Sequence, residues 1–133
     1  MGRANLKGAQ VDSSEAHGTG TALGDPIETA ALERVSGGKR CTPLHRGALK
    51  TQIGHLEAAS GVAGVLRLVG TLQQASMGPN LHLKTRNPHV DSHMLLLTTP
   101  SAGSGCNVAG VSSFGFSGTN AHTVFAASQP VHR

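Results

Sequence analysis

Two residues that could do chemistry, Lys50 and His55, stand five positions apart in the stretch KTQIGHLEAASGVAG, residues 50–64. A helix is predicted to start just after His55, and the positive end of a helix disfavours the imidazolium form. A neutral histidine there can donate one N–H to an oxyanion that develops during a reaction. Taken singly, Lys50 is better explained as a solvated strand-end lysine and His55 as a capping or packing residue. Their joint placement favours a site.

Glu57 is close enough in sequence to pair with Lys50 and hold its charge. The alternative is a first-turn glutamate that the helix dipole alone favours.

A second candidate is His17, in the stretch EAHGTGTALGDPIE, residues 15–28. The glycines of this stretch permit a backbone that brings amides near a ligand, and Thr19 and Thr21 offer hydroxyls to a polar chain lying along the loop. The pattern is neither GxxxxGK[ST] nor GxGxxG, so a nucleotide phosphate site has little support. An ordinary glycine-rich turn with a solvated His17 stays open as the alternative.

Two phenylalanines, Phe114 and Phe116, alternate with glycines near the C-terminus. A glycine-flanked aromatic ring can swing with little backbone strain, which indicates a gate. The alternative is that both rings are core residues of a hairpin. His122 alternates with small residues along a predicted strand, and we interpret it as structural.

Three further histidines are candidate metal ligands. Two of them stand at i, i+4, but they follow a proline in a turn-like segment, and no glutamate is arranged as in HExxH. We therefore expect no metal at His82, His89 and His93.

The elements that must position the first candidates follow from capping and turn signals. Asp25 predicts a helix N-cap, with Pro26 at the first helical position and Glu28 in a capping-box-like place. This helix should run to about Val35 and stop at the following glycines. A short strand at residues 47–50 should then deliver Lys50.

The helix after His55 should begin near residue 57 or 58, and glycine and proline at residues 78–79 end the helical region. Apolar residues at i, i+3, i+4, i+7 spacing predict one core face, and the other side is nearly apolar as well. Interior glycines cost roughly 1 kcal/mol each relative to alanine, which a buried helix packed closely on two sides would explain. The predicted core face consists of Val62, Val65, Leu66, Val69 and Leu72.

Shorter elements complete the expected order. A strand end or turn is expected at residues 11–12, a short apolar strand at residues 94–98, a turn at residues 100–105, and two strands around residues 114–118.

Composition narrows the class of protein. The 133 residues carry a formal charge of +4, and 14% of them are charged and 2% aromatic. No basic run is interleaved with aromatic residues, so nucleic-acid binding is not expected, and an acidic partner is only weakly indicated. Cys41 and Cys106 show no CxxC spacing, which favours a reduced, cytoplasmic chain. No apolar run approaches the roughly 18 residues of a membrane span, so we expect a soluble protein. One domain is expected over residues 11–127, after a polar start at 1–10 and before a tail at 128–133.

The motifs and their order resemble a known family: EAHGTGTALGDPIE, KTQIGHLEAASGVAG, PNLH, RNPHVD and GVSSFGFSGTNAH. They resemble the C-terminal part of a β-ketoacyl synthase domain. The motif sequences are more similar to those of modular type I polyketide synthases than to those of the discrete bacterial fatty-acid enzymes. The resemblance covers residues 11 to about 127. It implies an α/β fold, the C-terminal half of a thiolase-like fold that is layered αβαβα when complete, with a homodimer usual in the complete enzyme.

The resemblance also implies a reaction, the decarboxylative Claisen condensation of an acyl thioester with a malonyl-type extender in polyketide or fatty acid biosynthesis. A cysteine of the N-terminal half takes the acyl chain, and the extender is carried on the phosphopantetheine of acyl carrier protein, with no bound cofactor. By the same resemblance His17 and His55 are the catalytic histidines, Lys50 supports the site, Thr19 and Thr21 contact phosphopantetheine, and Phe116 gates access. Glu57, Phe114 and Asn120 are expected to support them.

The departures from the family pattern are also informative. Neither cysteine stands in a motif of the TACSS type, so the chain lacks the nucleophile that the resemblance calls for. Two smaller departures are the pair His45 and Arg46, where apolar strand residues are usual, and Gln52, where asparagine is common.

These departures leave two hypotheses of different classes. The first is a fragment or split portion of a ketosynthase, which relies on an N-terminal half for the cysteine. The second is a non-catalytic half-domain that binds acyl carrier protein or pairs with a synthase. A glycine-rich α/β domain without any carrier interaction is the third, and it requires the motif order to be accidental.

Overall fold

The computed structural model describes residues 6–36, 43–90, 95–97 and 103–128. Its centre is a five-stranded sheet made of β1 (Ser13–Glu15), β2 (Leu44–Gly47), β4 (Leu95–Leu97), β6 (Val108–Phe114) and β7 (Asn120–Ala126). The strand order is β4-β2-β1-β6-β7. All neighbours are parallel except β6 and β7, which form an antiparallel hairpin.

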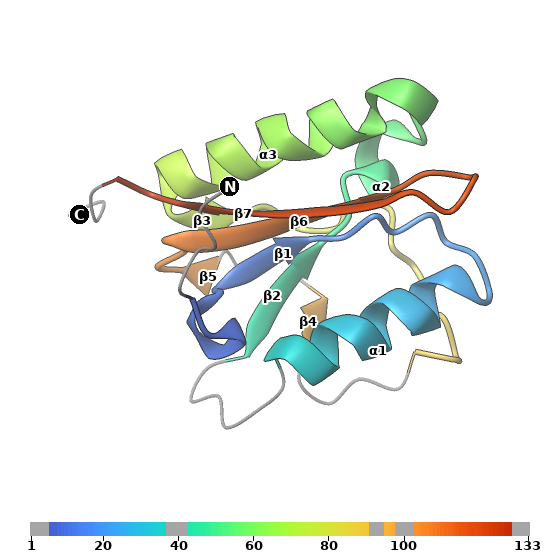
Figure 1. The fold of residues 1–133 in the computed structure, drawn as a ribbon, viewed down its shortest axis with the longest axis horizontal. Coiled ribbons are helices and arrows are strands. Elements are labelled where there is room, and N and C mark those ends of the chain that lie inside the picture. The colour runs from blue at the N-terminus through green and yellow to red at the C-terminus, as the bar shows by residue number, and fades with distance from the viewer. Residues whose placement is uncertain (1–5, 37–42, 91–94, 98–102, 129–133) are drawn as a thin grey trace.

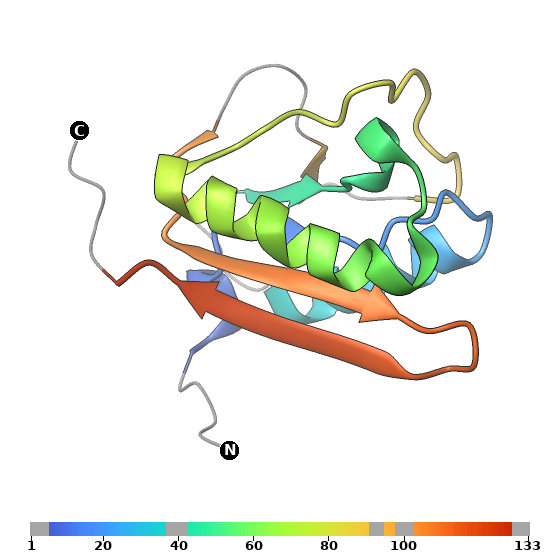
Figure 2. The same ribbon diagram turned by 90° about the horizontal axis from the view of Figure 1, so that it is seen from above.

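Two helices cover opposite faces of this sheet, α1 (Gly24–Ser36) and α3 (Ser60–Gln74) (Figure 1). Seen from above, α3 lies along β6 (Figure 2). Smaller elements are α2 (Lys50–Ile53), the 3-10 turns η1 (Gly8–Gln10) and η2 (Glu57–Ala59), and a two-stranded ladder of β3 (Ser76–Met77) with β5 (Gly103–Ser104). Among the described helices, none has the length and apolar character needed to cross a bilayer.

Several predicted elements are confirmed. The helix expected from residue 25 to about 35 is α1, the strand expected near residues 94–98 contains β4, and the strands expected around residues 114–118 are β6 and β7. The predicted N-cap is wrong, because α1 already begins at Gly24 and the Asp25 side chain accepts the Gly20 N–H of the preceding loop. The sheet begins slightly later than predicted, because β1 starts at Ser13, two residues after the expected strand end at residues 11–12. The turn expected at residues 100–105 is wrong in part, since β5 occupies two of those positions. Cys41 and His93 lie outside the described residues.

The predicted core face of α3 is wrong in part. Leu72 is buried as expected and Val65 is partly buried, but Val62 and Leu66 are 64% and 67% exposed. The buried face of α3 instead consists of Ser60, Gly64, Leu68, Thr71 and Leu72.

Small residues decided which face of α3 meets the sheet. A Cβ on Gly64 would stand 3.1 Å from Cγ2 of Val111, and a Cβ on Gly61 would stand 3.0 Å from Oγ of Ser113. The helix therefore approaches β6 through its glycines, where backbones can come closest. The outward apolar residues Val62, Leu66 and Val69 are called the exposed α3 stripe below.

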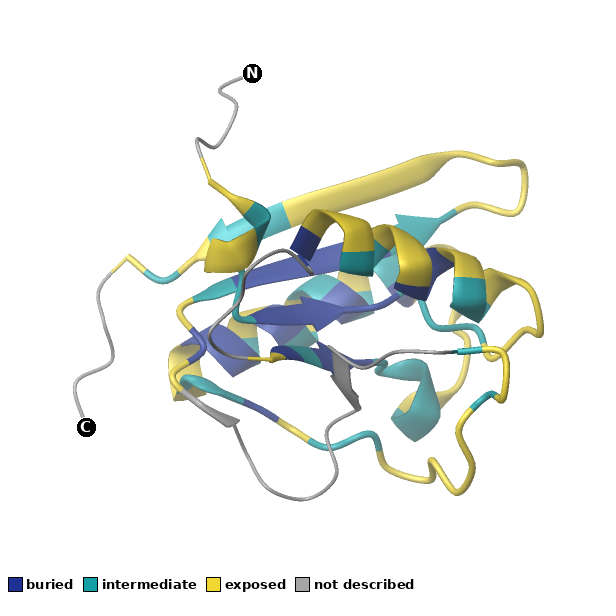
Figure 3. Ribbon diagram, turned by 90° about the horizontal axis from the view of Figure 1, so that it is seen from below, coloured by how far each residue is buried: buried dark blue, intermediate teal, exposed yellow. Residues whose placement is uncertain are grey.

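The core lies between α3 and the middle of the sheet. Leu68 and Leu72 pack on Ala109 and Val111 of β6, with Phe125 of β7 at the margin. Buried residues gather on the central strands, whereas the first half of β7 is exposed (Figure 3).

The expected strand at residues 47–50 is also wrong. β2 ends at Gly47 and Lys50 begins α2, because side chains from distant segments capture the next two amides. Ala48 N–H donates to Asn80 Oδ1 at 2.7 Å, and Leu49 N–H donates to the Glu15 carboxylate. The chain is turned away from the sheet by these bonds.

The limits of α3 differ from the prediction as well. The turn at residues 57–59 is a 3-10 helix, and α3 proper starts at Ser60. The helix ends at Gln74 rather than near residue 78, because Ala75 adopts a left-handed conformation with φ 49° and closes the last turn.

Candidate active site

Two histidines from distant parts of the chain lie side by side at one end of the sheet. His17 follows β1, and His55 stands between α2 and η2. Their ring centroids are 5.8 Å apart, with the planes at 84°. Phe114, the last residue of β6, packs on the other side of His17 with its ring centroid 5.3 Å away. The parallel strands and the β6–β7 hairpin thus bring together three residues singled out from sequence.

Hydrogen bonds select the same tautomer for both histidines. Nδ1 of His17 accepts the Phe114 N–H at 3.3 Å. Nδ1 of His55 accepts the Glu57 N–H at 2.8 Å and lies 3.0 Å from the Ser60 hydroxyl. An imidazole nitrogen that accepts an N–H carries no proton, so each neutral ring carries its proton on Nε2. Both rings therefore have a donor left over for a ligand.

The charge state of His17 agrees with that role. Burial lowers the pKa of His17 below its usual value, and the positive charge of Lys50 lowers it further. The carboxylate of Glu28 acts in the opposite direction without reversing the shift. The environment of His17 therefore favours the neutral imidazole.

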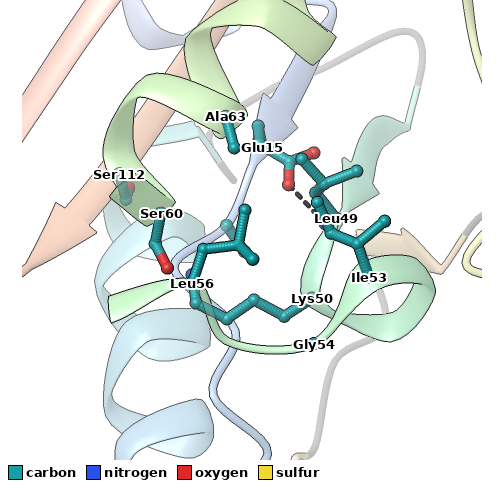
Figure 4. A pocket seen from close by; sticks show the side chains of 11 residues that line it. Glu15, Leu49, Lys50, Ile53, Gly54, Leu56, Ser60, Ala63 and Ser112 are labelled. Carbon is teal, nitrogen blue, oxygen red and sulfur yellow. Dashed lines mark hydrogen bonds between the residues drawn. The ribbon is translucent and has the colours of Figure 1, made fainter. Parts of the chain in front are cut away.

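Lys50 stands beside a buried carboxylate in a small pocket (Figure 4). Glu15 is almost wholly buried, accepts the Leu49 N–H, and pairs with Arg67 at 2.9 Å. Burial raises the pKa of the Glu15 carboxyl, although the charge of Arg67 opposes the shift. The pocket holds about 10 Å³, the space of roughly one water molecule.

The expected pairing of Glu57 with Lys50 is wrong. Burial lowers the pKa of Lys50, and the carboxylates that oppose this shift are Glu15 and Glu28. Glu57 is exposed and directs its backbone N–H to His55, at a left-handed φ of 49°. Such a conformation is strained for a residue other than glycine, and strain of this kind tends to be kept where a local bond requires it.

A buried ion pair holds the His17 loop. Glu28 Oε1 accepts the His17 N–H at 2.7 Å and Oε2 accepts the Gly18 N–H at 3.0 Å. Arg46 donates to the same carboxylate at 3.3 Å and to the hydroxyl of Thr29. Both charged residues are 5% exposed.

This support was not expected from the sequence, where Glu28 fits a capping box and Arg46 stands out only as a departure from an apolar strand. An arginine in a strand whose neighbours are buried, together with a carboxylate on the preceding helix, was the available signal. Ser60, five residues after His55, and Glu15, two residues before His17, were also not singled out.

The two threonines lie on the His17 loop but bond locally. The Thr21 hydroxyl accepts the Gly24 N–H at 3.0 Å and stands 3.5 Å from the Thr19 hydroxyl. Asp25 Oδ1 accepts the Gly20 N–H at 3.1 Å, so this loop is ordered by its own side chains. Within the described part of the chain, no hydrogen bond joins either threonine to an imidazole.

The hairpin between β6 and β7 forms the rim of an open cavity of about 690 Å³. Phe116 stands fully exposed at its tip, so it is not the hairpin core residue that the alternative required. Phe114 is opposite Asn120 in the strand register. The cavity is lined by His55, Glu57, Ala58, Phe114, Gly115 and Phe116.

Two further residues named in the sequence make local contacts. His122 lies on β7 with Nδ1 3.0 Å from the Ser112 hydroxyl. Gln52 donates to the Pro79 carbonyl at 2.8 Å. Among the described residues, no group of three or more histidine, cysteine, aspartate or glutamate side chains is arranged to hold a metal ion.

The sequence of this chain matches proteins of a known family. Residues 1–84 match the profile of the β-ketoacyl synthase, C-terminal domain. Polyketide synthase GfsA of Streptomyces halstedii is 45% identical in an alignment 135 positions long, which includes 95% of this chain and 2% of that protein. Erythronolide synthase EryA2 of Saccharopolyspora erythraea is 44% identical, over 93% of this chain and 4% of that protein.

Solved structures agree with the sequence relatives. The ketosynthase from module 6 of the bacillaene synthase of Bacillus subtilis 168 matches with a TM-score of 0.82 and 36% identity, over 96% of this chain and 24% of that chain. The chain thus spans about a quarter of a solved ketosynthase and a few per cent of the curated synthases. With its α/β layers, its motif order and these relatives, the chain belongs to the β-ketoacyl synthase family, as the C-terminal part of a polyketide synthase ketosynthase domain of thiolase-like fold.

Proposed function

We propose that this chain supplies the two-histidine wall of a condensation site, and that a second chain segment supplies the nucleophilic cysteine. One observation carries the proposal: two adjacent imidazoles each use Nδ1 as an acceptor, which leaves two Nε2–H donors. Two preorganised donors suit an enolate oxygen, and removal of one such donor costs roughly 3 to 4 kcal/mol in other enzymes.

The proposed reaction joins a malonyl-type thioester to an acyl group held on that cysteine. The bond from the malonyl α-carbon to its carboxylate breaks and releases CO₂, and the electron pair is left as an enolate. Nε2–H of His17 and Nε2–H of His55 hydrogen-bond to the enolate oxygen. The α-carbon then attacks the acyl carbonyl, and the cysteine leaves as a thiolate that takes up a proton.

Other residues have proposed roles around this step. Burial lowers the pKa of His17, and the positive charge of Lys50 lowers it further, so Lys50 helps to keep His17 a neutral donor. Thr19 and Thr21 would contact the phosphopantetheine arm of a carrier protein, and Phe116 would gate the entrance from its exposed position at the hairpin tip. Glu57, Phe114 and Asn120 would support the histidines and the hairpin. The substrates arrive on the carrier, so no bound cofactor is required.

Cys106 is a poor candidate for the nucleophile. It is buried, and burial raises the pKa of its thiol, which disfavours the reactive thiolate. The N-terminal half of a ketosynthase is therefore the proposed source of the cysteine, within a homodimeric complete enzyme.

Intact-mass analysis tests the proposal. The chain is mixed with an acyl thioester and a malonyl carrier protein, with and without a supplied N-terminal ketosynthase half. We expect no acyl adduct on this chain, and a β-ketoacyl product on the carrier only when the half is present. A stable adduct on Cys41 or Cys106 would refute the account. Absence of product with the half present would favour the non-catalytic half-domain that binds a carrier or pairs with a synthase.

A further inference from the structure

Ser60 is a buried serine at the start of α3, but the N-cap position of that helix belongs to Ala59. A serine at a helix start commonly caps the helix by accepting an N–H of the first turn. The Ser60 hydroxyl lies instead 3.0 Å from Nδ1 of His55. A hydroxyl at this position is therefore better explained by its contact with His55 than by the capping of α3.

The direction of this hydrogen bond follows from the other partner of His55. Nδ1 accepts the Glu57 N–H at 2.8 Å, and a ring nitrogen that accepts an N–H carries no proton. Ser60 must therefore donate its hydroxyl proton to the same nitrogen. A hydroxyl that donates one bond can still accept others, and Ser60 borders the small pocket that Glu15 and Lys50 also line (Figure 4).

Hydrogen bonds have to fix the ring of His55, because packing does not enclose it. His55 is exposed, and its ring contact with His17 is edge-on at a centroid distance of 5.8 Å. The two donors to Nδ1 stand two and five positions further along the chain, in η2 and at the start of α3. Because both converge on Nδ1, they hold that edge of the ring and leave Nε2 as the free donor.

We infer that Ser60 is a positioning residue that acts through His55, by holding the ring in the Nε2–H tautomer and in one orientation. The inference rests on the proposed function, since it deepens the role given there to His55. One such hydrogen bond corresponds to roughly a fivefold change in an equilibrium. Loss of the Ser60 hydroxyl should weaken the preference by about that factor without abolishing it, because the Glu57 N–H remains.

Nitrogen NMR measures the tautomer directly, since protonated and unprotonated ring nitrogens have different chemical shifts. The chain, isotopically labelled only at histidine nitrogen, is combined with an unlabelled N-terminal half at alkaline pH, and His55→Gln identifies the His55 signals. Ser60→Ala should raise the ratio of the Nδ1–H to the Nε2–H tautomer about fivefold. An unchanged ratio would overturn the inference.

The chain offers a matched control for this variant. The Ser112 hydroxyl also lies 3.0 Å from an imidazole Nδ1, that of His122 on β7. Ser112→Ala therefore removes the same kind of contact elsewhere in the sheet. It should leave the tautomer of His55 and the rate of condensation unchanged, and an effect on His55 equal to that of Ser60→Ala would contradict a specific role for Ser60.

Turnover with a malonyl carrier protein separates positioning from binding. Ser60→Ala should lower kcat about fivefold and change KM by less than about twofold, because the orientation of His55 matters for the enolate and not for the arm. Ser60→Thr keeps the hydroxyl and should restore kcat, while Ser60→Cys, whose thiol is a weak donor, should lie between serine and alanine. Full kcat in Ser60→Ala, or a loss confined to KM, would overturn the inference. Absence of product from the unmodified pair would refute the proposed function instead, and the tautomer ratio would still decide the role of Ser60.

Discussion

Replacing Arg46 by methionine should release the loop that carries His17. The Glu28 carboxylate is 5% exposed and has two backbone donors, His17 N–H and Gly18 N–H, besides Arg46. Removal of one partner from a buried ion pair typically costs about 3 kcal/mol or more, because the remaining charge is left without compensation. If that cost appears as easier local opening, the two amides should exchange hydrogen roughly 150-fold faster.

Hydrogen exchange read by mass spectrometry measures this effect in the chain combined with an N-terminal half. Peptides over residues 15–24 should exchange faster, while peptides over residues 108–126 should change little. The double variant Glu28→Gln with Arg46→Met leaves no orphan charge, so it should recover at least half of the lost protection. Arg34→Met is the control for removal of an exposed arginine. A change below about threefold in residues 15–24, or a double variant worse than Arg46→Met, would refute the role of the ion pair.

Three further changes have defined outcomes. Lys50→Met removes a charge that lowers the pKa of His17, so the acid limb of the condensation rate should move to higher pH; an unmoved or lower limb in a pH profile contradicts this. Leu66→Asp on the exposed α3 stripe should reduce dye binding and aggregation of the chain alone, and it should abolish reconstitution with an N-terminal half. A cooperative monomeric unfolding transition of the unmodified chain would argue against an unpartnered apolar face. Gly18→Ala should lower the free energy of unfolding of the reconstituted pair in urea by about 2 kcal/mol, because the φ of Gly18 is +53° and a Cβ would stand 2.8 Å from the Ala48 methyl. A loss under about 0.5 kcal/mol, the level of a neutral surface change, would contradict this.

Sequence reasoning succeeded where a short local pattern decides the structure. The start of α1 follows from aspartate and proline in its first turn, and the hairpin follows from alternating residues around a glycine-rich turn. The pairing of His17 with His55 was accessible only through motif order, since 38 residues separate them and no local rule brings them together.

Failures arose where distant side chains decide the local conformation. Lys50 starts a helix because Asn80 and Glu15 capture the two amides before it, and neither contact can be read from the residues around position 50. The face of α3 was misassigned because the helix is apolar on both sides, and close approach at Gly64 outweighs the larger apolar residues. Arg46 has no explanation within its own strand, because its partner Glu28 lies across the α1 interface.

The exposed α3 stripe and the open cavity are linked through His55. Ser60, at the start of α3, bonds to the His55 ring, and Val62 stands four residues after Ala58, which lines the cavity. We expect a partner that covers the stripe to extend to the rim of the cavity and to exclude water from both imidazoles in the same event. Diethyl pyrocarbonate should modify His17 and His55 more slowly once the N-terminal half is bound, while exposed His89 serves as the control. Equal modification rates with and without the half would show that covering the helix leaves the imidazoles open, and that the cavity requires a separate lid.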